Sequence, residues 1–201
     1  MNFSKIYELA PQMKVYNELG YKWEPFIMLL QKPNFRSNIV NTDSFGLRFN
    51  DQFISKNISI FDKKKEFNKK IGTMLGSSAL FGVGASSDNF TIPSILSEKT
   101  ENNFYNLGGR AYSGFQEVVL FNSLINKLEN LQTVIVFSGV NDIFFNSYIE
   151  KYDQILGPIF FNKQFKEAMF ASSLDWKKKL VKFFFQPLKN TAWPFGSGCI
   201  P

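Results

Sequence analysis

Apolar side chains near the start of the chain recur at the spacing of a helix. This spacing predicts a helix over residues 3–19, ended by Gly20, since glycine commonly follows the last helical turn. The apolar positions on its face are Ile6, Leu9, Ala10, Met13 and Tyr16. The apolar stretch Trp23–Leu30, which stops before Pro33, is expected to be a second short helix or an extended segment.

Between residues 38 and 60 the pattern changes to short runs that are typical of strands. These runs are Ile39–Val40, Gly46–Phe49 and Phe53–Ile60. A charged connector over residues 63–68 follows them. We therefore expect a small helical and antiparallel appendage over residues 1–62, and a main α/β domain over residues 63–201.

From residue 71 onward, strand patterns alternate with helix patterns. The expected strands are Ile71–Leu75, Asn103–Leu107 and Thr133–Phe137, and the expected helices cover residues 92–99 and 115–128. Thr91 is expected to cap the first of these helices, because its hydroxyl can accept a free N–H of the first turn. The β-branched run 133–137 predicts a central strand buried on both faces. The alternation indicates a doubly wound parallel sheet.

The pattern weakens after residue 141. Helices are expected over residues 143–152, 165–170 and 176–185, the last with a basic face. Residues 193–201 carry no pattern of a helix or strand, so we expect the α/β domain to be incomplete at its C-terminus.

Composition narrows the possible classes of protein. The chain has 201 residues, 44% of them hydrophobic, which suits a globular domain with a substantial core. The net charge of +6 raises the possibility of nucleic-acid binding. However, the lysine runs at 63–65 and 177–179 lack interleaved aromatic residues, so we interpret them as solvated faces and expect no nucleic-acid partner.

The chain has no histidine and a single cysteine, Cys199. An intrachain disulfide is therefore impossible, and neither a metal nor another cofactor is expected. The N-terminus lacks the apolar core of a signal peptide, and the longest apolar stretches are too short to cross a bilayer. These features predict a cytoplasmic protein without a membrane span, and no pattern indicates its oligomeric state.

Three short segments of small and polar residues follow the three predicted parallel strands. They are residues 76–78, 106–113 and 138–142. Open α/β sheets bind their ligands at the carboxyl ends of the strands, so these segments are candidates for a site. Taken one at a time, each is equally well explained as an ordinary turn.

Together, the three segments resemble the sequence blocks of the SGNH (GDSL-type) hydrolase superfamily. Gly76-Ser77-Ser78, followed by Phe81-Gly82, is similar to the block that carries the nucleophile. Asn106-Leu107-Gly108 opens the second block, and Gly139-Val140-Asn141-Asp142 matches the Gly-x-Asn-Asp block. Residues 88–96 also resemble the Asp…Thr-x-Pro…Leu stretch of many members. The resemblance covers residues 71–143 and implies a flavodoxin-like three-layer sandwich that hydrolyses O-acyl esters of saccharides or other small molecules.

The resemblance also implies the roles of individual residues. Ser78 is the expected nucleophile, and the backbone N–H groups of Ser78 and Ala111 and the side-chain amide of Asn141 are the expected oxyanion donors. Ala111 stands where the family usually has glycine. Ser77 fits less well than Ser78, because Phe81-Gly82 would then be displaced by one residue. Ser86 and Ser87 are expected to be surface or capping residues.

Two further residues adjoin this predicted site. Arg110 is expected either to bind an anionic sugar or carboxylate, or to be a loop arginine that faces solvent or a neighbouring aspartate. Asp142 is expected to orient the loop of Asn141 by accepting backbone N–H groups.

The Asp-x-x-His block of the superfamily is absent, so Ser78 has no imidazole base in this sequence. Two interpretations stay open. The sequence is the N-terminal part of a longer enzyme, which we favour because Ser78 and Asn141 are both present, or it is a relative without catalytic activity that binds a ligand. An O-acyltransferase with the same acyl-enzyme chemistry is an alternative to the hydrolase.

Overall fold

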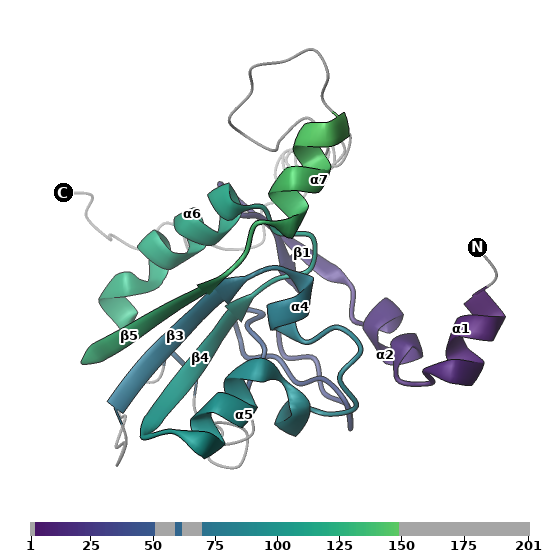
Figure 1. Ribbon diagram of the computed structural model, residues 1–201, viewed down its shortest axis with the longest axis horizontal. Coiled ribbons are helices and arrows are strands. Elements are labelled where there is room, and N and C mark those ends of the chain that lie inside the picture. Colours follow the sequence, from purple (N-terminus) through teal and green to yellow (C-terminus); the bar gives the residue numbers. More distant parts are fainter. Residues whose placement is uncertain (1–2, 51–58, 62–69, 149–201) are drawn as a thin grey trace, which may run out of the picture. The chain divides into compact units, whose positions relative to one another are not determined.

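The computed structural model describes residues 3–50, 59–61 and 70–148 (Figure 1). Contacts divide the chain into two units, residues 1–160 and 161–201, and all the described residues belong to the first. Of the strand expected over residues 53–60, residues 53–58 lie outside the described residues, and residues 59 and 60 are not in a strand. The connector 63–68 and the helices expected at 165–170 and 176–185 also lie outside the described residues. So do the final residues, 193–201.

The N-terminal segment forms two short helices and a hairpin. The helices are α1 (Phe3–Leu9) and α2 (Met13–Glu18), where one continuous helix was expected. Pro11 explains the break, because proline has no N–H to donate and disfavours a helical residue before it. The strands β1 (Tyr21–Glu24) and β2 (Met28–Gln31) pair antiparallel, which confirms the extended alternative for this region.

Residues 32–50, the described segment that follows β2, contain little regular structure. The strands expected at residues 39–40 and 46–49 are not formed, and the segment contributes a single isolated bridge between Thr42 and Arg48. Side-chain hydrogen bonds organise much of this segment instead, as described below.

Three parallel strands form the main sheet in the order β4-β3-β5 (Figure 1). They are β3 (Lys70–Gly76), β4 (Asn102–Gly108) and β5 (Leu131–Phe137), close to the expected positions. The expectation that β5 is central was wrong: β3 is central, and within the described residues β5 pairs only with β3. Val136 of β5 is 64% exposed. A β-branched run reflects strand propensity, and it does not fix the place of the strand in the sheet.

Helices cover both faces of this sheet, which gives three layers. Helix α5 (Ile92–Lys99) begins as expected at Thr91, whose hydroxyl accepts the Ser94 N–H, and it packs on one face with Met74 and Phe104. On the opposite face, α6 (Gly114–Leu124) continues into a 3-10 turn, η2 (Ile125–Lys127) (Figure 1). The remaining elements are α4 (Ser78–Phe81), η1 (Asp88–Phe90) and α7 (Val140–Tyr148).

The core on the α6 side of the sheet includes residues that precede and residues that follow position 62, the expected boundary between the appendage and the main domain. Ile27, Leu30 and Leu47 belong to the same buried cluster as Leu107 and Leu120. The N-terminal segment therefore contributes to the hydrophobic core that supports the sheet. No helix in the described ranges is both long enough and apolar enough to cross a membrane.

Candidate functional site

The fold brings the three segments with candidate site residues to one edge of the parallel sheet. Gly76 at the end of β3 pairs with Gly108 of β4 and with Phe137 of β5, so the three strands end level with one another. The chain passes from β3 to β4 on one side and then to β5 on the other. Such a reversal of strand order is where open α/β sheets form their ligand crevice.

The serine turn lies directly after the central strand. Ser77 has an extended backbone, and Ser78 is the first residue of α4, which ends at Gly82 in a left-handed conformation (φ 87°). Ser77 is 8% exposed, whereas Ser78 is partly exposed. Within the described ranges, the Ser78 hydroxyl takes part in no hydrogen bond. Of the two serines, Ser78 is thus the more accessible to a substrate.

The second segment approaches the serine turn closely. A Cβ atom on Gly108 would lie 2.5 Å from the backbone nitrogen of Phe81, so only glycine fits between β4 and α4. Asn106 donates from Nδ2 to the carbonyl of Leu80 (3.3 Å), and its Oδ1 accepts the Gly108 N–H (2.9 Å). Ala111 follows with a left-handed backbone, φ 63°. The sequence pattern did not predict this conformation, which is rare for residues with a side chain.

The third segment is hydrogen-bonded to the second. Asn141 donates from Nδ2 to the carbonyl of Tyr112 at 2.8 Å, and the amide has a second hydrogen to donate. Both carboxylate oxygens of Asp142 accept the Gly114 N–H, at 2.9 and 3.0 Å. Asp142 thus accepts a backbone N–H group as expected, and its role in orienting the loop of Asn141 stays a prediction. The structure thus brings the second and third segments together at the end of the sheet.

Arg110 binds the N-terminal segment. Its guanidinium donates to Oε1 of Gln31 (2.5 Å) and to the carbonyls of Tyr16 and Gly20 (both 2.6 Å). The guanidinium carbon also lies 4.1 Å from the centre of the Tyr21 ring. Burial lowers the pKa of Arg110. The expectation of an arginine facing solvent or an aspartate was wrong, whereas a role in binding substrate stays a prediction.

The sequence pattern did not single out a buried ion pair that supports the serine turn. Arg48 Nε lies 2.6 Å from Asp88 Oδ1, and Arg48 Nη1 donates to the carbonyls of Phe81 (3.0 Å) and Gly82 (2.9 Å). Burial raises the pKa of Asp88, and the Arg48 guanidinium opposes that shift. One signal was present, because arginine is scarce in this lysine-rich chain and Arg48 lies between the apolar Leu47 and Phe49.

Glu117 is a second buried ionisable residue that the sequence pattern did not single out. It lies on the buried side of α6, and its Oε1 accepts a hydrogen bond from the Ser138 hydroxyl at 2.7 Å. Burial raises the pKa of Glu117 to about 7, and the nearby Asp142 carboxylate acts in the same direction. The spacing to Leu120 and Leu124 places all three on one helix face, which was a usable signal of burial.

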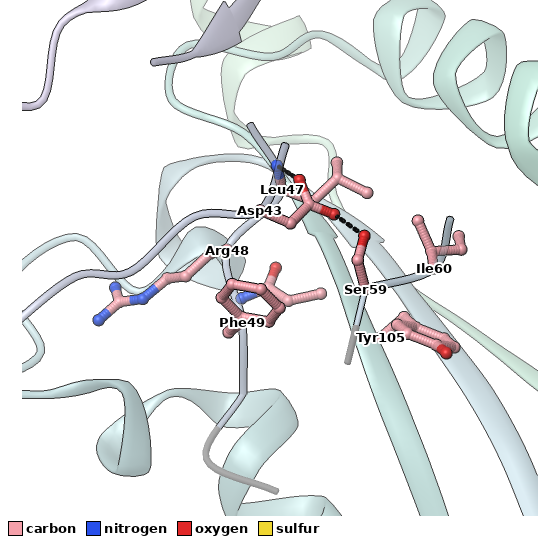
Figure 2. A pocket seen from close by; sticks show the side chains of 8 residues that line it. Asp43, Leu47, Arg48, Phe49, Ser59, Ile60 and Tyr105 are labelled. Atoms are coloured by element: carbon pink, nitrogen blue, oxygen red, sulfur yellow. Dashed lines mark hydrogen bonds between the residues drawn. The ribbon is translucent and has the colours of Figure 1, made fainter. Parts of the chain in front are cut away.

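A small pocket lies beside β4, and Asn106 is the one residue of the three segments that lines it. Figure 2 shows the Asp43 carboxylate directed at Ser59 and at the backbone of Leu47. Asp43 Oδ1 also accepts the N–H groups of Phe45 and Gly46, and burial raises its pKa. Because the carboxylate closes its own turn, we assign this pocket a structural role. The lining residues are Asp43, Leu47, Arg48, Phe49, Ser59, Ile60, Tyr105 and Asn106.

In the part of the chain that the structure describes, no group of three or more Asp, Glu, Cys or His residues could hold a metal ion. No protein-family model matches the sequence, and no curated protein matches it. The arrangement of Ser78, Ala111 and Asn141 is therefore the main indication of function in the described residues.

Proposed function

We propose that the protein is an SGNH-type serine hydrolase that acts on O-acyl esters of saccharides or other small molecules. We further propose that the α/β domain has the flavodoxin-like sandwich fold of that superfamily. The observation that carries the proposal is the convergence of the three segments. An accessible serine, a left-handed Ala111 and the amide of Asn141 follow three adjacent parallel strands, and Asn141 is bonded to the loop that contains Ala111.

In the proposed reaction, Ser78 Oγ attacks the acyl carbonyl and the alcohol departs, which leaves an acyl-enzyme that water then hydrolyses. The backbone N–H groups of Ser78 and Ala111 and the free N–H of Asn141 stabilise the oxyanion of each tetrahedral intermediate. Losing one such donor typically raises the barrier by about 3–4 kcal/mol. At position 141 an amide is needed, because a carboxylate cannot donate to an anion.

The sequence contains no histidine, so these 201 residues contain no imidazole that could accept the proton of the Ser78 hydroxyl. The proposal assigns this step to a His–Asp pair, as the resemblance to the superfamily implies. An imidazole beside the serine would accept its proton during attack and return it to the leaving alcohol.

The test compares Ser78→Ala with the parent protein, both expressed with any coding sequence that follows codon 201. We expect the parent to hydrolyse p-nitrophenyl acetate and to be labelled by a fluorophosphonate at Ser78, and the variant to do neither. Ser86→Ala is the matched control, because Ser86 lies beyond the turn and is exposed. Equal hydrolysis by Ser78→Ala and the parent would defeat the assignment.

The absence of histidine favours a second candidate, a ligand-binding relative that uses the same crevice without catalysis. This candidate predicts that Ser78 stays unlabelled by the fluorophosphonate even in the protein with its native C-terminus. The labelling experiment therefore separates the two functions.

A further inference from the structure

Residues 12–31, here called the α2–β2 segment, contact the chain on both sides of the proposed oxyanion site. On the side of the serine turn, Gln12 Nε2 donates to the carbonyl of Gly84 at 2.9 Å. The Tyr16 hydroxyl lies 2.6 Å from the carbonyl of Gly82 and 2.8 Å from that of Ala85. These contacts fix the residues that follow α4, the helix that begins with Ser78.

On the other side, the same segment binds the loop between β4 and α6. Arg110 donates to the carbonyls of Tyr16 and Gly20, which belong to the last turn of α2 and the residues just beyond it. Carbonyls at a helix C-terminus have no partner within the helix, so the guanidinium satisfies them. Tyr16 thus contacts both sides, through its hydroxyl towards Gly82 and through its carbonyl towards Arg110.

Gln116 adds a third contact near the end of this loop. Its Nε2 donates to the carbonyl of Ile27 in the hairpin turn at 2.8 Å, and its Oε1 accepts the N–H of Ser113 at 3.0 Å. The loop is consequently held on both sides of Ala111. Arg110 binds the α2–β2 segment directly, and Ser113 is linked to it through Gln116.

The backbone of Ala111 needs such support. The left-handed conformation is sterically unfavourable for a residue with a side chain, because Cβ comes close to the backbone carbonyl oxygen. This conformation persists only where the surrounding structure fixes it. The direction of the Ala111 N–H therefore depends on the residues that hold the loop. Arg110, its immediate neighbour, donates three hydrogen bonds to residues outside the loop.

We propose that the α2–β2 segment is a positioning element of the acyl-transfer site, and that Arg110 is the residue through which it fixes the Ala111 N–H. This inference rests on the proposed function, because the N–H matters as an oxyanion donor. The planar guanidinium suits the role, since its fork binds three acceptors at once, whereas a lysine ammonium is a single point charge on a flexible stem. In this role Arg110 contacts protein and leaves the substrate to other groups.

The first test measures amide hydrogen exchange in the full chain for Arg110→Ala, Arg110→Lys and the parent. We expect exchange of the peptide 108–113 to rise at least about tenfold in both variants, while the peptide over α5 stays unchanged. Low, non-denaturing concentrations of guanidinium should partly restore protection in Arg110→Ala. Arg36→Ala is the control, because the hydrogen bonds of Arg36 stay within residues 35–42. Parent-like exchange in both Arg110 variants would overturn the proposal.

The second test measures phosphonylation of Ser78 as a function of probe concentration. We expect Arg110→Lys to lower the maximal rate constant about 10- to 100-fold, with little change in the concentration giving half-maximal rate, because a donor is displaced while the probe pocket remains. An unchanged maximal rate with weaker probe binding would instead show that Arg110 contacts the ligand. If the parent is not labelled, the proposed function fails, and the exchange measurement still decides whether Arg110 fixes the loop.

Discussion

Arg48 Nε and Asp88 Oδ1 lie 2.6 Å apart, and both side chains are almost completely buried. The same guanidinium binds the carbonyls of Phe81 and Gly82, at the end of the helix that begins with Ser78. Asn41 Nδ2 donates to the other Asp88 oxygen at 2.7 Å. This ion pair therefore links the N-terminal segment, the serine turn and η1 in one polar network.

Removing the charge of Asp88 should strongly destabilise the fold. We expect Asp88→Asn to lower the free energy of unfolding by about 3–5 kcal/mol, because Arg48 would remain buried without a counter-ion. Urea denaturation of the variant and the parent measures the difference. Glu98→Gln, an exposed acidic residue on α5, is the control and should shift stability by no more than about 0.5 kcal/mol. Equal stability of the two variants would contradict the prediction.

Because the Ala111 backbone is left-handed, substitutions by glycine and by a β-branched residue should have different effects on stability. Ala111→Gly should leave stability unchanged or raise it by up to about 1 kcal/mol, because glycine adopts positive φ without steric cost. Ala111→Val should lower stability by at least about 1 kcal/mol, because a β-branched residue fits this conformation poorly. Thermal and urea unfolding of both variants provide the measurement. A Val variant as stable as the Gly variant would argue against the left-handed conformation.

Asn141→Asp tests the proposed oxyanion role of the amide. We expect kcat for ester hydrolysis to fall about 10²–10³-fold, since the carboxylate cannot donate to the oxyanion and also loses the bond to the Tyr112 carbonyl. Steady-state kinetics on p-nitrophenyl acetate measure the loss. Asn122→Asp introduces the same charge at an exposed position on α6 and should retain the parent rate. Comparable losses in both variants would point to a general effect of charge.

Glu117 should make stability depend on pH near neutrality. Burial raises its pKa from 4.5 to about 7 in the folded protein, so the folded state binds more protons than the unfolded state between these values. The free energy of unfolding should therefore fall as pH rises from about 4.5 to 7, by up to about 3 kcal/mol from this residue.

Glu117→Gln removes this titration while keeping an oxygen that accepts the Ser138 hydroxyl. We expect the variant to lose less stability than the parent between pH 5 and pH 8, in urea denaturation at each pH. Glu129→Gln, at an exposed position, should follow the parent. Parallel pH profiles for Glu117→Gln and the parent would exclude Glu117 as the titrating group.

The sequence pattern predicted the parts of the fold that depend on local propensity and on periodic burial. The three parallel strands, the Thr91 cap and the polar segments after the strands all belong to this class. The pattern misplaced β5 at the centre of the sheet, because strand order depends on long-range packing that a single strand does not encode. It also joined α1 and α2, although Pro11 marked the break.

In the candidate site, too, local sequence patterns could be interpreted, whereas long-range contacts could not. Ser78 and Asn141 could be proposed as site residues because their neighbours in sequence form a pattern. Arg48, Glu117 and the contacts of Arg110 were missed because each depends on partners far along the chain. Arg110 and Tyr16, for example, are separated by 94 positions. Only the folded arrangement shows that an arginine in the loop between β4 and α6 binds the end of an N-terminal helix.

The pairing of Arg48 with Asp88 has a consequence for synthesis on the ribosome. Arg48 is made 40 residues before its counter-ion, and an unpaired arginine resists transfer from water into a protein interior. Residues 39–50 therefore cannot complete their native packing while the nascent chain ends before Asp88. The Arg48 guanidinium therefore stays hydrated until the serine turn and η1 have been translated.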